Sequence, residues 1–190
     1  MSGARPALWT VLLVTSLAAA CPLLAVDFAG VTVADSVEVG GRELKLNGTG
    51  LLKKLVFKVY VVALYLPAPA HDDEAAVGPD EPKSLVMHFL RAVSREALVG
   101  ALERGFAANA GERAKRAESQ IAKLLAVVKD MKGGERLTFV YEPGKGSTVT
   151  ATDGTTVTLE GKDFADAFLL LYIGPKPPKE EMKRNLLGQL

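Results

Sequence analysis

The feature that most constrains this chain is the run over residues 46–67, which starts with glycine-rich L-N-G-T-G, continues through alternating side chains and ends at Pro67. Alternate positions of a strand lie on opposite faces. One parity is almost wholly apolar: Leu55, Phe57, Val59, Val61, Ala63 and Tyr65. The other mixes cations, a phenol and aliphatic groups: Lys54, Val56, Lys58, Tyr60 and Val62. The pattern predicts one long strand with a core face and a face that could line a cleft.

The order of the remaining segments predicts the fold class. Short β-type runs precede this strand around the turn Gly40-Gly41, and an exposed loop over 71–83 follows it. Two amphipathic helices are expected, the first capped by Ser94 and the second over 114–131. A three-stranded meander over 136–159, a buried helix over 164–173 and an amphipathic segment over 179–187 complete the chain. This order is typical of an α+β domain with a largely antiparallel sheet and a layer of helices on one face.

The first residues read as an export signal. Arg5 supplies a positive charge, residues 7–20 are apolar, and the alanines at 18–20 suit a signal peptidase. We expect a signal peptide over 1–25, cleaved after Ala20, Ala25 or Ala29, and a single domain over 26–190. The apolar stretch is shorter than the roughly 20 residues of a comfortable membrane span, so the mature protein is expected in the periplasm without a stable span. Lipid anchoring through Cys21 is a minor alternative.

Composition narrows the classes of partner and cofactor. Cys21 is the only cysteine, which excludes an intramolecular disulfide, a CxxC redox site and a cysteine-ligated zinc. The formal net charge is +1 with no basic block, so nucleic acid is not an expected partner. The carboxylates at 72–74 lie in a proline-flanked loop typical of solvated surface. We therefore expect no metal and no cofactor.

Several segments in order resemble one family. L-N-G-T-G with the following K-K-L-V-F-K-V-Y-V-V-A-L-Y-L-P is similar to the first strands of the chalcone isomerase family, and most closely of the bacterial chalcone isomerase-like proteins. The resemblance continues through 86–91, 141–146, 159–168 and 186–188. It implies an open-faced sandwich with a ligand cleft between the sheet and the helices, in a family that includes fatty-acid-binding relatives.

The chain departs from the plant enzymes of that family at the position that matters for chemistry. They place an arginine shortly after the G-x-G turn to stabilise an anion, and Leu52 stands here instead. Their tyrosine and asparagine near the first helix also lack counterparts between Glu96 and Glu103. We therefore expect no flavonoid cyclisation and, more generally, a protein that is not an enzyme.

Four residues are candidates for binding a ligand: Lys54, Lys58, Tyr60 and Arg91. A phenol can donate a hydrogen bond to a carboxylate or carbonyl, and the cations can serve as counter-ions. The competing interpretation is that Tyr60 packs its ring while the lysines face solvent. His88 has the opposite parity to Arg91 and is expected to have a structural role.

Three functions remain open from the sequence. The first is an exported protein that binds a small amphipathic molecule, such as a fatty acid, between sheet and helices. The second is an isomerase or lyase that uses Tyr60 as a proton donor tuned by Lys58. The third is a periplasmic accessory protein whose cleft is plugged by its own side chains and whose exposed helix over 179–187 docks a protein partner. Whether the space beside Tyr60 is open or filled separates these functions.

Overall fold

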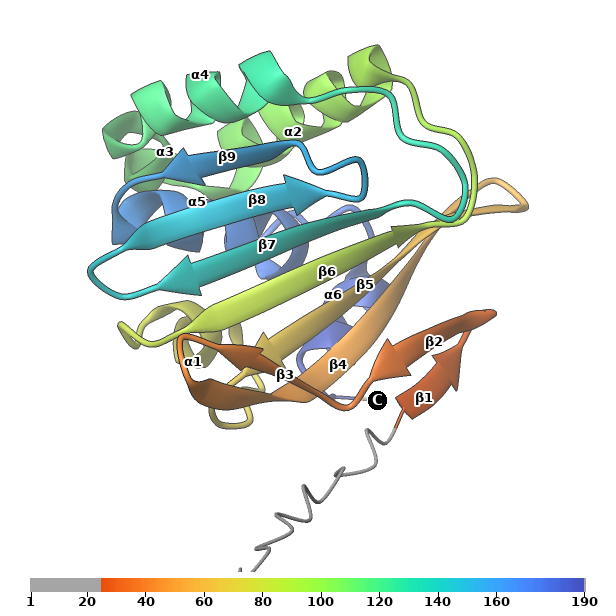
Figure 1. Ribbon diagram of the computed structural model, residues 1–190, viewed down its shortest axis with the longest axis horizontal. Coiled ribbons are helices and arrows are strands. Elements are labelled where there is room, and N and C mark those ends of the chain that lie inside the picture. Colours follow the sequence, from red (N-terminus) through yellow and green to blue (C-terminus); the bar gives the residue numbers. More distant parts are fainter. Residues whose placement is uncertain (1–24, 190) are drawn as a thin grey trace, which may run out of the picture.

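The computed structural model describes residues 25–189. Cys21 and all but the last residue of the predicted signal peptide lie outside the described residues. Seven antiparallel strands form one sheet in the order β3-β4-β5-β6-β7-β8-β9, and β1 and β2 form a separate two-stranded ribbon (Figure 1). The strands are β1 (Ala25–Phe28), β2 (Val31–Ala34), β3 (Ser36–Val39), β4 (Arg42–Lys54), β5 (Phe57–Leu66), β6 (Lys83–Phe89), β7 (Arg136–Glu142), β8 (Gly146–Ala151) and β9 (Thr156–Leu159). The helices are α1 (Asp73–Val77), α2 (Arg95–Asn109), α3 (Gly111–Arg116), α4 (Glu118–Val127), α5 (Lys162–Ile173) and α6 (Glu180–Leu186).

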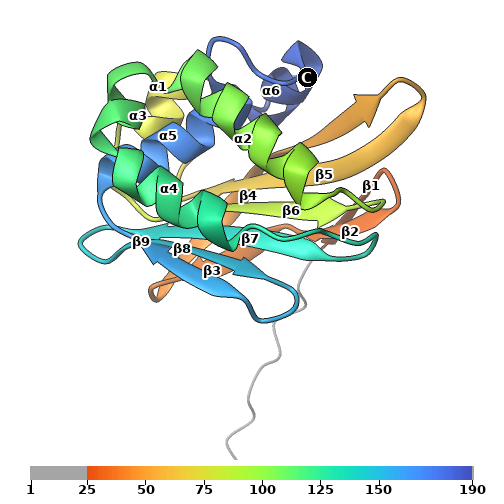
Figure 2. The same ribbon diagram turned by 90° about the horizontal axis from the view of Figure 1, so that it is seen from above.

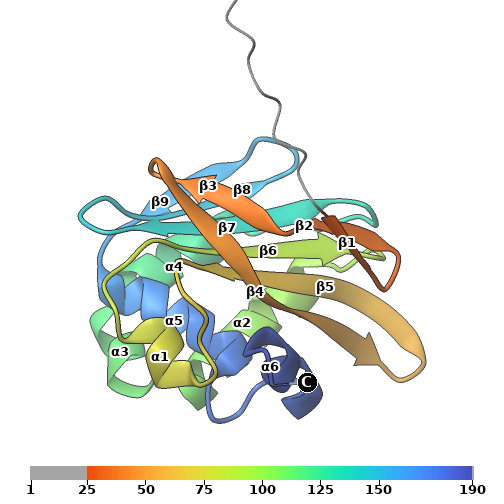
Figure 3. The ribbon, with the colours of Figure 1, turned by 90° about the horizontal axis from the view of Figure 1, so that it is seen from below.

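The helices cover one face of the sheet, as Figures 2 and 3 show, which confirms the predicted α+β class. The centre of that layer is α5, in which every residue from Phe164 to Ile173 is buried. Its Phe168 ring stacks on Phe139 of the sheet at a centroid distance of 4.6 Å. The opposite face forms a second apolar cluster, in which Val33 of β2 packs with β5 residues such as Val61 and Tyr65. Both faces of β5 therefore pack into apolar clusters, where the sequence predicted one core face and one face that could line a cleft.

The prediction of a single long strand is wrong, because residues 46–67 form a hairpin of two strands. The chain reverses at Leu55-Val56, so that Lys54 at the end of β4 pairs with Phe57 at the start of β5. Leu55 adopts a positive φ of 55° to make the turn. Two-residue hairpin turns usually carry Gly, Asn or Asp, and none occurs here, so the alternating pattern runs through the reversal without a turn signal.

The helical predictions were correct in position but not in continuity. Ser94 caps α2 as expected, since its hydroxyl accepts a hydrogen bond from the Ala97 backbone N–H at 3.3 Å. The helix expected over 114–131 is instead α3 and α4, because Ala117 leaves helical geometry with φ −98° and ψ 10°. The chain becomes extended after Val127, and Met131 pairs with Val93 through two backbone hydrogen bonds of 2.8 and 2.9 Å.

The glycines of L-N-G-T-G let α6 lie directly on β4. A Cβ at Gly48 would lie 2.0 Å from the Asn185 carbonyl oxygen, and one at Gly50 would lie 2.2 Å from the Met182 Cγ. Asn47 holds the same junction, since its Nδ2 donates to the Leu186 carbonyl at 2.7 Å. The apolar side chains of the segment over 179–187 are buried against the protein's own sheet: Met182, Leu186 and Leu187. Only its polar side is exposed, and docking of a protein partner there stays a prediction.

Candidate functional site

A cavity of about 960 Å³ lies between the sheet and the helices α2 and α4. Apolar side chains make up much of its sheet wall, and Tyr60 lies among them: Leu52, Val59, Met87, Phe89 and Leu137. The space beside Tyr60 is therefore open. The plugged-cleft alternative relied on Leu52, Val56 and Val62 as filling residues. Val56 is exposed at the hairpin turn, and neither Val56 nor Val62 lines the cavity, so only Leu52 remains.

The α2 wall combines small and large side chains. The cavity-lining residues of α2 include the small Ala97, Ala101 and Ala108 and the larger Leu98 and Leu102. Only Phe106 and Asn109 of this helix are buried. Larger residues at the alanine positions would fill part of the gap between α2 and the sheet. Small residues on a helix also suit close helix packing, as at Gly105, where a Cβ would lie 2.6 Å from Leu171 Cδ2 of α5, so the sequence did not indicate a cavity wall.

Tyr60 is the polar group of the inner cavity wall. Its side chain is 8% exposed, lines the cavity and makes an edge-to-face contact with Phe89 at 5.9 Å. Within residues 25–189 its hydroxyl has no hydrogen-bond partner, and burial raises the pKa of the phenol above its ordinary value. The group therefore remains a protonated donor. Because Tyr60 lines the cavity, this hydroxyl is available to an acceptor on a ligand.

A second phenol lies close to the first. Tyr172 of α5 also lines the cavity, and its hydroxyl donates to the Met87 sulfur at 3.1 Å. Burial raises the pKa of Tyr172, and the nearby Tyr60 raises it further. No sequence signal distinguished Tyr172 from the other buried side chains of its helix, because its role depends on how α5 packs on β6.

A β-bulge decides which candidates share the cavity with Tyr60. Leu52 pairs with Tyr60 and Lys53 pairs with Lys58, which leaves Val59 without a partner in the ladder. Val59 and Tyr60 consequently both line the cavity, whereas Lys58 points to the other face with its Nζ 3.4 Å from the Ala29 carbonyl oxygen. The parity argument that grouped Lys58 with Tyr60 is therefore wrong.

The structure does bring Lys54 and Arg91 to the cavity, at its outer end beside the hairpin turn. The Arg91 guanidinium lies over the Phe57 ring at 4.4 Å from the centroid. Lys54, Tyr60 and Arg91 thus share one space, with the cations at the mouth and the phenol deeper. Leu52, at the position of the family's arginine, faces the cavity directly opposite Tyr60. Whether these residues bind a ligand stays a prediction.

His88 pairs with Val61 and lies on the face away from the cavity. Burial lowers its pKa, and the neighbouring Arg136 charge lowers it further. The placement agrees with the parity opposite to that of Arg91, and a structural role for His88 stays a prediction.

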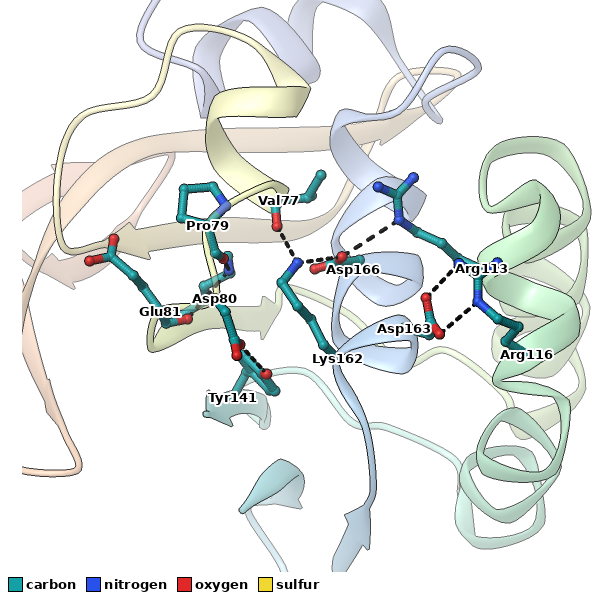
Figure 4. A network of polar contacts seen from close by, with 11 residues as sticks. Val77, Pro79, Asp80, Glu81, Arg113, Arg116, Tyr141, Lys162, Asp163 and Asp166 are labelled. Carbon is teal, nitrogen blue, oxygen red and sulfur yellow. Dashed lines mark hydrogen bonds and ion pairs between the residues drawn. The ribbon is translucent and has the colours of Figure 1, made fainter. Parts of the chain in front are cut away.

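A partly buried polar network lies at the N-terminal end of α5, and no pattern in the sequence indicated it (Figure 4). Asp166 accepts from Lys162 at 2.6 Å and lies 3.5 Å from Arg113, while burial raises the pKa of its carboxyl. Arg116 forms two 2.7 Å hydrogen bonds to Asp163, and Tyr141 donates to Asp80 at 2.6 Å. Lys162 also donates to the Val77 carbonyl of α1 at 2.6 Å, so these contacts join α1, α3 and α5, while the Tyr141 bond joins β7 to the segment after α1. Asp163 and Asp166 each have a cationic partner. The network therefore reads as structural.

Comparison with known proteins identifies the family of the chain. A family model described as chalcone isomerase-like matches residues 25–188. The chain belongs to the chalcone isomerase-like family. Its fold is similar to the crystal structure of a fatty-acid binding protein from Arabidopsis thaliana, with a TM-score of 0.64 at 15% identity over 86% of this chain and 96% of that one. No curated protein matches the sequence. Within residues 25–189, moreover, no helix has the length and apolar character needed to cross a membrane.

Proposed function

We propose that this chalcone isomerase-like protein binds a single-chain amphipathic molecule, such as a fatty acid, in the cavity between its sheet and α2. The observation that carries the proposal is the open, largely apolar space of about 960 Å³ beside Tyr60. Its size lies in the usual range of small-molecule sites, roughly 300 to 1,000 Å³. Each methylene group buried there contributes about 0.8 kcal/mol, so an alkyl chain supplies most of the affinity.

The polar groups orient such a ligand with its head at the mouth. Lys54 and Arg91 are exposed cations at the outer end, where an ionised carboxylate keeps part of its hydration. Deeper in the cavity Leu52 offers no charge, and an ionised carboxylate beside Tyr60 would lose its hydration without a counter-ion. The Tyr60 hydroxyl is then left for a neutral polar group on the ligand, which gives the site a means of selectivity.

The enzymatic alternative has less support. It needed a phenol made acidic by Lys58, yet Lys58 lies on the other face of β5 and burial raises the pKa of Tyr60. A phenol in this state is a weak acid at neutral pH. We therefore propose a binding protein without catalytic activity, and, from the pattern of residues 1–25, one that is exported to the periplasm.

Calorimetric titration with saturated fatty acids of increasing chain length tests the proposal. Affinity is expected to rise about fourfold for each added methylene group until the cavity is filled. Ala101→Phe, which places a ring in the cavity, should lower the affinity for long chains at least tenfold. Ala107→Phe is the matched control, because Ala107 is exposed on the same helix and does not line the cavity. Absence of binding, or equal loss in both variants, would refute the proposal.

A further inference from the structure

The β4–β5 hairpin extends beyond the rest of the molecule, as Figures 2 and 3 show, and its apex is apolar. Leu55 is 89% exposed, Val56 is 83% exposed and Phe57 is 53% exposed. Among residues 25–189 the only other large apolar side chain of comparable exposure is Val26, at 50%. A contiguous exposed apolar patch on a soluble domain marks a surface that contacts something.

Hairpin geometry does not account for these residues. Leu55 alone of the two turn residues has a positive φ, a conformation for which Gly is preferred and which strains a residue with a branched side chain. On the face away from the cavity, Lys53 and Lys58 are direct cross-strand partners, and like charges in that position destabilise a hairpin. In the part of the chain that is described, neither lysine forms an ion pair. In water, the apex is thus less stable than the same hairpin would be with a glycine in the turn and no pair of like charges beside it.

Cations surround the apolar apex on both faces of the hairpin. Residues 53–58 read K-K-L-V-F-K, with three lysines and no acidic residue. Arg91 adds a fourth cation where its guanidinium lies over the Phe57 ring. Apolar side chains bordered by lysine and arginine match the boundary of an anionic bilayer, where acyl chains meet negatively charged headgroups. A second copy of the apex would instead bring like charges together.

We infer that the hairpin apex, defined as residues 53–58, docks on the surface of an anionic lipid bilayer. Val56 and Leu55 enter the headgroup boundary, and the lysines contact lipid phosphates. Docking reduces the repulsion between Lys53 and Lys58, because anionic headgroups beside them supply compensating negative charge. Since Lys54, Leu55, Phe57 and Arg91 also line the cavity mouth, the docked protein holds that mouth against the lipid surface. Passage of a fatty acid between bilayer and cavity rests on the proposed function, whereas docking itself does not.

Co-sedimentation of the purified, ligand-free protein with vesicles tests the inference. Binding is expected to vesicles of phosphatidylcholine with added phosphatidylglycerol, to be weak on phosphatidylcholine alone, and to fall as salt is raised. Val56→Asp should reduce the partition coefficient at least tenfold. Lys53→Gln with Lys58→Gln should reduce it about fivefold for each charge removed. The matched control is Lys115→Gln with Lys123→Gln, which removes two exposed lysines on α3 and α4 and should leave partition unchanged.

The result that supports docking is loss of vesicle binding in both apex variants with normal binding in the control. Unchanged binding in the apex variants, or equal loss in the control, would overturn it. So would a dimer in light scattering that dissociates with Val56→Asp, or vesicle binding that is absent in the native protein. Fatty-acid titration without vesicles separates the two proposals, because Val56, Lys53 and Lys58 do not line the cavity and their variants should bind ligand normally.

Discussion

Replacing Gly48 by alanine tests whether the L-N-G-T-G motif exists to seat α6. The added Cβ would lie 2.0 Å from the Asn185 carbonyl oxygen, 2.8 Å from the Leu186 carbonyl oxygen and 2.9 Å from the Asn185 carbonyl carbon. All three are backbone atoms, so a change of side-chain rotamer cannot relieve the overlap. Helix α6 must move away from β4 by more than an ångström.

The cost follows from what that movement disturbs. Met182, Leu186 and Leu187 are at most 1% exposed, and each contributes roughly 1.5 to 3 kcal/mol when fully buried. A shift weakens these contacts without exposing the side chains fully, and overpacking typically costs about 1 to 3 kcal/mol. The 2.7 Å hydrogen bond from Asn47 to the Leu186 carbonyl is strained as well, at about 1 kcal/mol. We therefore expect Gly48→Ala to lower the free energy of unfolding by about 2 to 4 kcal/mol.

Urea denaturation followed by far-ultraviolet circular dichroism measures this change. Gly100→Ala is the control of opposite sign, because this α2 glycine would meet only the flexible end of Arg104 at 3.1 Å. Alanine in a helix interior is favoured by up to about 1 kcal/mol, so this variant should be neutral or more stable. If Gly48→Ala unfolds within about 0.5 kcal/mol of the native protein, the packing argument for the motif is refuted.

Three further predictions concern the site, pH and the buried network. Leu52→Arg places a cation opposite Tyr60 and should increase the preference for a fatty acid over the alcohol of equal length at least tenfold. Calorimetry measures both affinities. An unchanged preference would contradict the placement of residue 52 on the wall of the cavity. The pKa of His88 is lowered from 6.5 in the folded protein, so as pH falls His88 binds a proton in the unfolded chain before it does so in the folded one. The stability contributed by neutral His88 is therefore complete above pH 6.5 and decreases as pH falls below 6.5. Denaturation midpoints should fall more steeply with decreasing pH in the native protein than in His88→Gln, and parallel curves would dismiss this histidine as the cause. Asp166→Asn leaves the partly buried Lys162 and Arg113 without their carboxylate partner and should lower the free energy of unfolding, measured by urea denaturation, by about 1 to 3 kcal/mol. Fatty-acid affinity should be unchanged, and a loss of affinity would show that the network belongs to the site.

Hydrophobic periodicity was sufficient for the fold class and most element positions, because burial of one face leaves a regular pattern in the chain. It located α2 with its Ser94 cap, the meander of β7, β8 and β9, and the buried helix α5. It failed at Leu55-Val56, where the turn lacks the residues that normally mark one. It failed again at Ala117, where backbone geometry changes within an uninterrupted apolar stripe.

For the site, the sequence determined that Leu52 replaces the arginine of the plant enzymes, and it predicted a phenol and cations that could line a cleft. Tertiary structure decided which of these groups meet. The bulge at Val59 removes Lys58 from the cavity, the gap between α2 and the sheet forms that cavity, and the reversal at Leu55 carries Lys54 to its mouth. Parity along a strand is local information, whereas a bulge and a helix–sheet gap depend on contacts between segments far apart in the chain.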